Sequence, residues 1–185
     1  MTSNSRRVLG IVGSPRRNGN TDTLVDEVLA GAKESGASTQ KVRLIERVIS
    51  PCGACDVCRK KGKCVQQDDM SDLLDEMWRS DVWVLGTPVY WWGPTAQFKA
   101  FLDRWYGVIN QSHFKNKRIV LVVPLEDNSA SVYGPILDMF RGIIDYLDMN
   151  HVATVLATGL LEKAAATKHD EILVSARKAG REAGR

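Results

Sequence analysis

The chain has 185 residues, a formal net charge of +3 and a hydrophobic content of 44%. This length predicts a single domain over residues 1–185 with a sizeable core, and the small net charge argues against a nucleic-acid-binding surface. No uninterrupted apolar run approaches the roughly 20 residues that a membrane span needs. A polar N-terminus runs into the first apolar segment without a signal-peptide core, so we expect a cytoplasmic protein that binds neither nucleic acid nor membrane.

Strand and helix patterns alternate along the chain. The first apolar run, at 8–12, shows no polar alternation, which is typical of a strand buried on both faces. Apolar residues then recur at helical spacing from Leu24 to Ala32. Further strands are expected at 41–45, 82–86, 118–123 and 152–158, and further helices around 68–78, 98–105, 136–147 and 170–184. Five strand–helix pairs predict an α/β fold with a parallel sheet covered on both faces.

The loop after the first strand has the chemistry of an anion site. Gly13-Ser14-Pro15 ends the strand, and Asn-Gly-Asn-Thr at 18–21 is typical of a turn and a helix N-cap. A loop in this position turns backbone N–H groups and the positive end of a helix dipole toward a phosphate. The side chains that crowd it are Ser14, Arg16, Arg17, Asn18, Asn20 and Thr21.

The residue pattern of the same loop indicates which kind of phosphate it would bind. The nucleotide pattern G-x-x-x-x-G-K-[ST] and the dinucleotide pattern G-x-G-x-x-G are both absent from it. A loop rich in hydroxyl and amide groups, without a Lys-Ser/Thr pair, suits a terminal monoester phosphate such as that of FMN. An ordinary strand–helix turn with surface arginines is the alternative.

Three adjacent aromatic residues follow the third expected strand. Tyr90, Trp91 and Trp92 lie in a loop bounded by Gly and Pro, where they are hard to explain as core. They offer a flat wall to an aromatic ring, and Gly93 allows close backbone approach. Ligands of open parallel sheets bind beyond the carboxyl ends of the strands, so we expect this loop, the phosphate loop and the loop at 124–131 to border one pocket. A hydrophobic plug or an oligomer contact is the alternative.

All four cysteines lie within 13 positions, spaced C-x2-C-x2-C-x5-C, in a loop expected at about 50–67. They are Cys52, Cys55, Cys58 and Cys64. C-x2-C-x2-C is the tight spacing by which thiolates bind one iron–sulfur cluster. Zinc would use the same four ligands, although zinc modules usually separate two C-x-x-C pairs widely. Cysteines without bound metal are the third possibility.

Together these motifs resemble the NAD(P)H-dependent FMN reductases of the flavodoxin-like superfamily, and the four-cysteine loop is similar to that of the iron–sulfur flavoproteins. The resemblance rests on segments 13–16 with 18–21, 51–64 with 68–70, 87–91 and 99–104, in order along nearly the whole chain. It implies a flavodoxin-like three-layer α/β/α fold with a five-stranded parallel sheet of order 2-1-3-4-5. It also implies a homodimer or a homotetramer.

The resemblance also implies roles for individual residues. The FMN phosphate would be held by Ser14, Arg16, Asn18, Asn20 and Thr21. The isoalloxazine ring would be lined by Pro88, Val89, Tyr90, Trp91, Trp92 and Gly93. A [4Fe–4S] cluster would be ligated by Cys52, Cys55, Cys58 and Cys64.

The resulting hypothesis is an enzyme that passes electrons from NAD(P)H through FMN to a quinone, a flavin or another small-molecule or protein acceptor. The flavin carries the chemistry, so no catalytic side chain is expected. His113, His151 and His169 are interpreted as structural or surface residues. A flavin-binding electron carrier without its own substrate is one alternative. An FMN reductase whose cysteine loop holds zinc or no metal is the other.

Overall fold

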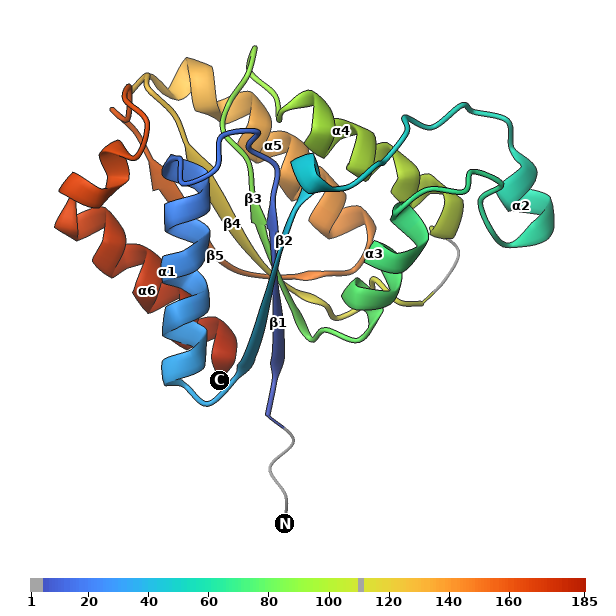
Figure 1. The fold of residues 1–185 in the computed structure, drawn as a ribbon, viewed down its shortest axis with the longest axis horizontal. Helices are drawn as coiled ribbons and strands as arrows, with labels where there is room; N and C mark the ends of the chain where they lie inside the picture. The colour runs from blue at the N-terminus through green and yellow to red at the C-terminus, as the bar shows by residue number, and fades with distance from the viewer. Residues whose placement is uncertain (1–4, 110–111) are drawn as a thin grey trace.

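The computed structural model describes residues 5–109 and 112–185. Five parallel strands lie at its centre in the order β2-β1-β3-β4-β5, which confirms the predicted sheet (Figure 1). They are β1 (Arg7–Val12), β2 (Ser38–Arg43), β3 (Val82–Gly86), β4 (Arg118–Pro124) and β5 (Asn150–Ala157). The strand order reverses between β1 and β3, and this is the position at which open parallel sheets bind ligands.

Helices cover both faces of the sheet (Figure 1). One face carries α1 (Asn20–Glu34) and α6 (Asp170–Gly184), and the other carries α3 (Met70–Trp78), α4 (Ala96–Asp103) and α5 (Ala130–Tyr146). Alternate residues of a strand face opposite sides, and β1 follows this rule. Val8 and Val12 pack into the core under α1 and α6. Leu9 and Ile11 pack into the core under the other three helices.

Glycines let α1 and α6 pack with their backbones almost in contact. A Cβ atom at Gly180 would lie 1.9 Å from the carbonyl oxygen of Val28, and one at Gly31 would lie 2.0 Å from that of Arg177. No real Cβ atom is found so close to a carbonyl oxygen, so these two positions require glycine. The close packing fixes the C-terminal half of α1 against α6.

The second strand differs from its expected bounds, 41–45. β2 begins at Ser38 and pairs with β1 from Arg7↔Ser38 to Val12↔Arg43, while Leu44 begins a 3-10 turn, η1 (Leu44–Glu46). The residues at 38–40 are polar and exposed on this edge strand. Backbone hydrogen bonds hold them in the sheet, and a hydrophobic pattern gives no sign of such bonds.

Two further segments add detail to the expected elements. The cysteine loop contains a short helix, α2 (Val57–Lys61), and projects from the helical layers at the right of Figure 1. The helix expected at 98–105 is divided in the structure. Its α-helical part, α4, ends at Asp103, and the 3-10 helix η2 (Arg104–Val108) follows directly. A third 3-10 helix, η3 (Ala165–Lys168), precedes α6. None of the helices in the described residues combines the length and hydrophobicity that a membrane crossing requires.

Candidate functional site

A hollow of about 260 Å³ lies beyond the carboxyl ends of β1, β3, β4 and β5. It brings together seven of the predicted cofactor-binding residues, Ser14, Arg16, Asn20, Thr21, Pro88, Val89 and Tyr90. The loop after β4 supplies Pro124, Leu125 and Glu126, as the sequence predicted for a third wall. Asn18, Trp91, Trp92 and Gly93 lie in the same loops but do not line the hollow.

The phosphate loop presents donors at the start of α1. Ser14 and Thr21 are buried, with 5% and 2% of their surfaces exposed. The N-cap residue is Gly19, which has no side chain to pair with the free N–H groups of the first helical turn. Those N–H groups and the positive end of the helix dipole therefore remain available to an anion.

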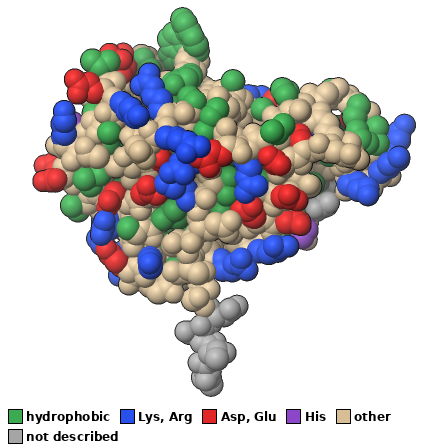
Figure 2. All heavy atoms as spheres, viewed as in Figure 1, with side chains coloured by type: hydrophobic (Ala, Val, Ile, Leu, Met, Phe, Trp, Pro, Cys, Tyr) green, Lys and Arg blue, Asp and Glu red, His purple; other side chains and the backbone are tan. Residues whose placement is uncertain are grey.

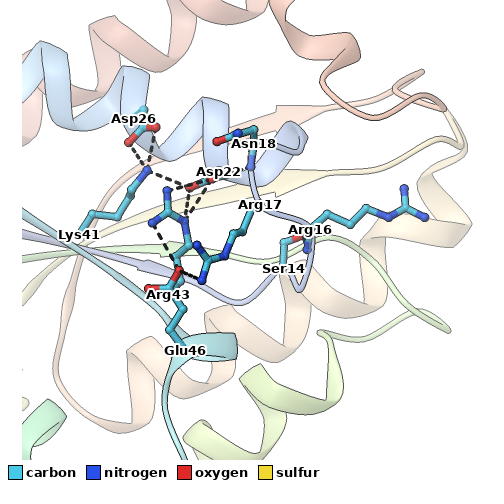
Figure 3. A network of polar contacts seen from close by, with 9 residues as sticks. All are labelled: Ser14, Arg16, Arg17, Asn18, Asp22, Asp26, Lys41, Arg43 and Glu46. Carbon is cyan, nitrogen blue, oxygen red and sulfur yellow. Dashed lines mark hydrogen bonds and ion pairs between the residues drawn. The ribbon is translucent and has the colours of Figure 1, made fainter.

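Asp22 holds this loop in shape from the first turn of α1 (Figure 3). Its carboxylate is buried and accepts hydrogen bonds from the Asn18 N–H at 2.8 Å, from Lys41 Nζ at 2.9 Å and from Arg43 Nε at 3.2 Å. Burial alone would raise the pKa of Asp22, but the hydrogen bonds from Lys41, Asn18 and Arg43 outweigh it and lower the pKa.

Asn18 thus contributes its backbone to the network, and it adopts a left-handed conformation with φ 54°. Sequence reasoning missed Asp22. Its signal was an acidic residue in the first turn of the expected helix, which is common enough to pass unnoticed.

The two arginines of the loop lie differently. Arg17 forms an ion pair with Glu46 at 3.1 Å, and Figure 3 shows it turned toward β2 and η1. Arg16 points away from that network and lines the hollow. Arg16 is therefore the arginine of this loop that is placed to meet a bound phosphate.

The side chain of Asn20 is engaged with the loop after β5. Its Nδ2 donates to the carbonyl oxygens of Leu160 at 3.3 Å and Glu162 at 2.9 Å, and its Oδ1 accepts from the Ala166 N–H at 3.0 Å. Both amide hydrogens are used in these contacts. Asn20 lines the hollow, and its side chain positions a neighbouring wall.

That neighbouring wall consists of Leu160, Leu161 and Lys163. It is joined to the loop after β4 by hydrogen bonds from the Leu160 N–H to Leu125 O and from the Gly159 N–H to Glu126 O, both 3.0 Å long. Sequence reasoning missed this wall. The available signal was position, because the loop after each parallel strand lies at the same edge of the sheet.

The aromatic loop has two parts: residues 88–90 line the hollow, and residues 90–93 form an exposed turn. Tyr90 and Gly93 are joined by two backbone hydrogen bonds, of 2.8 and 3.1 Å. Between them Trp91 and Trp92 have φ values of 50° and 62°, as in a type I′ turn. Trp91 is 90% exposed. Figure 2 shows a hydrophobic projection where this loop lies in Figure 1.

Threonines fix the base of the aromatic loop. Thr95 donates from Oγ1 to the carbonyl oxygen of Gly13 at 2.6 Å and accepts from the Phe98 N–H at 3.3 Å, so it caps α4 and ties it to the phosphate loop. The Thr95 N–H in turn donates to Thr87 Oγ1 at 3.2 Å. Both threonines are fully buried.

The four cysteines lie in the projecting loop as free thiols. Cys52 and Cys55 are exposed, and Cys58 and Cys64 are partly buried. All four line one small hollow, together with the buried guanidinium of Arg104. Within the described residues, however, no three His, Cys, Asp or Glu side chains are close enough together to hold a metal ion.

With this geometry established, the chain can be compared with known proteins. Residues 6–159 match the model of the NADPH-dependent FMN reductase family. The chain belongs to this family. It is 42% identical over 98 residues to an iron–sulfur flavoprotein of Methanocaldococcus jannaschii, covering 53% of this chain and 51% of that protein. It is 41% identical over 98 residues to an iron–sulfur flavoprotein of Archaeoglobus fulgidus, covering 53% of this chain and 44% of that protein.

The chain thus spans about half the length of these curated relatives. Among solved structures, it is similar to the NAD(P)H:quinone oxidoreductase from Methanothermobacter marburgensis, with a TM-score of 0.77 and 17% identity. That match covers 96% of this chain and 98% of the other. At such low identity, the likeness shows that the two proteins share a fold.

The hollow beyond the carboxyl ends of β1, β3, β4 and β5, the first hollow, fits FMN, the cofactor for which the family is named. Its phosphate end would be formed by the uncapped start of α1, the Ser14 and Thr21 hydroxyls and Arg16. Its other walls combine apolar side chains such as Val89 with the Tyr90 ring. A polar, cationic end next to an aromatic wall matches the phosphate and ring of FMN.

The cysteine hollow fits an anionic, sulfur-bound group in its chemistry. It has four thiols and the buried guanidinium of Arg104, which pairs with Asp68 and whose Nε has no hydrogen-bond partner among the described residues. An iron–sulfur cluster on four thiolates is negatively charged and accepts hydrogen bonds at its sulfurs. The donor set therefore suits a cluster, although the thiols are not gathered around a common centre in this conformation.

Proposed function

We propose that this member of the family is an FMN-dependent oxidoreductase that takes electrons from NAD(P)H and passes them to a quinone, a flavin or another acceptor. The observation that carries the proposal is the first hollow. There the uncapped N-terminus of α1 and two buried hydroxyls meet an aromatic wall, at the point where the strand order reverses.

The protein's part in this reaction is binding and orientation. Ser14, Thr21, Arg16 and the first-turn N–H groups of α1 would hold the phosphate. Residues 88–90 would lie against the ring, and the turn that contains Trp91, Trp92 and Gly93 would form its outer edge. When bound, FMN supplies hydride acceptance from the nicotinamide and electron delivery to the acceptor.

We assign the cysteine loop to a [4Fe–4S] cluster ligated by Cys52, Cys55, Cys58 and Cys64. The shared hollow, the buried cation and the names of the two iron–sulfur flavoproteins support this assignment. When bound, such a cluster supplies one-electron transfer, which complements a two-electron hydride donor. Zinc in the same loop, or no metal, would leave the FMN part of the proposal unchanged.

The exposed aromatic residues support a homodimer or a homotetramer. Trp91 and Tyr146 are 90% and 75% exposed, and Tyr90 and Trp92 are also exposed. Contiguous exposed apolar groups, such as those at 90–92, commonly mark contact surfaces. Sedimentation of the FMN-loaded protein would give the number of chains.

The proposal is tested on anaerobically purified protein. Its absorption spectrum is recorded, and iron, sulfide, zinc and FMN are quantified on the same sample. Flavin bands with about four iron atoms per chain, together with turnover of NADH or NADPH with a quinone, support the whole proposal. Flavin bands and turnover without iron contradict the cluster assignment and leave the FMN part of the proposal standing. Bound FMN without turnover indicates an electron carrier, and protein that refuses added FMN contradicts the proposal.

A further inference from the structure

Arg104 is almost fully buried at the start of η2, below the cysteine loop. Only 4% of its surface is exposed. Its guanidinium reaches both ends of the loop, because Nη1 donates to the carbonyl oxygen of Ser50 at 3.0 Å and Nη2 donates to Asp68 Oδ1 at 3.1 Å. Asp68 in turn accepts from the Ser50 N–H at 3.0 Å. Arg104 and Asp68 together therefore close the loop at its base.

The same guanidinium also reaches the sulfur site. Nη2 lies 3.5 Å from Cys64 Sγ, within hydrogen-bonding range for sulfur. Nε is buried and has no partner in the described structure, although Arg104 borders the hollow that all four cysteines line. The ion pair with Asp68 offsets the charge of Arg104, and its unused N–H donor beside four thiols is complementary to a group bound by sulfur that accepts hydrogen bonds.

The rest of η2 supports the loop from the same side. Gly107 packs against Cys58 and Cys64, since a Cβ added at Gly107 would lie 3.7 Å from the Cβ of Cys58 and 3.9 Å from the Cβ of Cys64. Tyr106 donates from its hydroxyl to Asp56 Oδ1 at 3.0 Å. One short 3-10 helix thus contacts the base, two cysteines and the tip of the loop.

We propose that Arg104 is the positioning residue of the four-cysteine site. It holds the two ends of the loop together, keeps Cys64 in the hollow and donates hydrogen bonds to the group that the thiolates bind. The last role rests on the proposed cluster, whereas the first two concern the protein alone. Hydrogen bonds to ligating sulfurs stabilise the reduced, more negative form of a cluster, so they raise its reduction potential.

The test compares Arg104→Lys with Arg47→Lys. Arg47 is the control, because it also pairs with a carboxylate, Glu76, at 2.8 Å, and that partly exposed pair lies outside the cysteine hollow. The lysine at 104 keeps the charge but loses the planar fork that reaches Ser50, Asp68 and Cys64 at once. Both variants are purified anaerobically, and their FMN content is measured as the sign of a folded first hollow.

Two readouts then separate the roles. Trypsin is applied to metal-free protein, and its cleavage within 59–63 reports on the closed loop. Iron content and an EPR-monitored redox titration report on the sulfur site. For Arg104→Lys we expect about tenfold faster cleavage, together with less iron or with a potential lowered by about 59 mV, the equivalent of a tenfold change for one electron. Arg47→Lys should match the wild type in both.

Each outcome decides the proposal. If cleavage, iron content and potential in Arg104→Lys all equal those of the wild type, the proposal is wrong. If the wild type itself holds no iron, the proposed cluster fails, and the trypsin comparison alone decides whether Arg104 positions the loop. If Arg104→Lys does not fold, the double variant Asp68→Asn/Arg104→Gln replaces it, since removing both buried charges together is tolerated better than removing one. The same accelerated cleavage is expected of that variant, and unchanged cleavage overturns the proposal.

Discussion

The carboxylate of Asp22 gives the phosphate loop its shape, although Asp22 does not line the hollow. It orients the Asn18 N–H and pairs with two cations from β2. Asn20 has a comparable role on the other side, where its amide holds the loop after β5. Residues of a binding loop therefore divide into those that face the ligand and those that hold the loop in place.

Replacing Asp22 with Asn should weaken FMN binding. The Asn18 N–H, Lys41 and Arg43 would lose their charged acceptor, and hydrogen bonds to charged groups contribute about 1.5–3 kcal/mol each. We expect the unfolding free energy to fall by about 2 kcal/mol and the Kd for FMN to rise about tenfold. Urea denaturation and fluorescence titration of the apoprotein measure the two quantities.

Asp26→Asn is the matched control for this change. Asp26 pairs with the same Lys41, but its side chain is 55% exposed, and exposed ion pairs contribute only about 0–1 kcal/mol. Asp26→Asn should therefore change neither the unfolding free energy nor the Kd for FMN much. Equal losses in both variants would mean that charge around Lys41, and not the contact with Asn18, supports the loop.

At the scale of elements, the turn at 90–93 carries backbone strain. Bulky residues rarely adopt positive φ, and type I′ turns favour Asn-Gly in the two central positions. Trp91 and Trp92 occupy those positions instead. Such strain is often retained at functional sites, and this turn borders the proposed FMN site.

The double variant Trp91→Asn/Trp92→Gly should be more stable than the wild type. Each strained residue costs about 1–3 kcal/mol, and 1 kcal/mol shifts the Tm of a domain of this size by about 2–4 °C. We expect a Tm higher by about 4 °C or more, with slower turnover of NAD(P)H if the rings contact FMN or the acceptor. Differential scanning calorimetry and steady-state kinetics measure these effects. A lower Tm would show that the tryptophans stabilise the fold, and Tyr146→Ala controls for the loss of an exposed aromatic ring.

The close packing of α1 on α6 makes a second prediction at this scale. In Gly180→Ala, the new Cβ would lie 1.9 Å from the Val28 carbonyl oxygen, so the two helices must separate. We expect a loss of about 3 kcal/mol of unfolding free energy and a Tm lower by about 6–12 °C. Gly142→Ala, in α5, has nothing within 4 Å of its added Cβ and should be neutral or stabilising by up to about 1 kcal/mol. Similar losses in both variants would contradict the packing explanation.

At the scale of the whole molecule, α4 and η2 join the two sites. Thr95 ties the start of α4 to the phosphate loop, and Arg104, directly after α4, holds the cysteine loop. A helix rises about 1.5 Å per residue, so these anchors are separated by about 14 Å along one rigid element. The fold therefore sets the spacing between the proposed FMN hollow and the cysteine loop.

Acid should destabilise the whole molecule through two buried carboxylates. The pKa of Asp68, like that of Asp22, is lowered from 3.8, because hydrogen bonds from Arg104 and two backbone N–H groups outweigh its burial. The unfolded chain therefore binds more protons as the pH falls. The contribution to stability is complete above about pH 5 and is lost as the pH falls through the folded pKa values.

Urea denaturation between pH 3 and pH 7 tests this expectation. The unfolding free energy of the wild type should be nearly constant at the upper end and should fall steeply below about pH 4. Asp22→Asn should show a shallower acid decline, because one of the two linked carboxyls is gone. An identical acid slope in that variant would show that other carboxyls dominate.

The alternation of strands and helices along the chain, the parallel sheet and the loops that carry polar or aromatic residues could all be predicted from the sequence. These features depend on local periodicity and on turn chemistry, both of which can be recognised in short segments of the sequence. The bounds of β5 and α6 were predicted to within two residues for the same reason. The edge strand β2 was not, because backbone pairing with β1 holds its polar half.

The roles of residues that are far apart in the chain depend on contacts that form only in the folded molecule. The fold places Lys163 and the loop after β5 in the hollow proposed for FMN, directs the amide of Asn20 to that loop, and turns Trp91 outward. It also brings Arg104 to Cys64 across 40 positions. Such contacts form where the carboxyl ends of parallel strands and the ends of packed helices meet, and no local pattern encodes them.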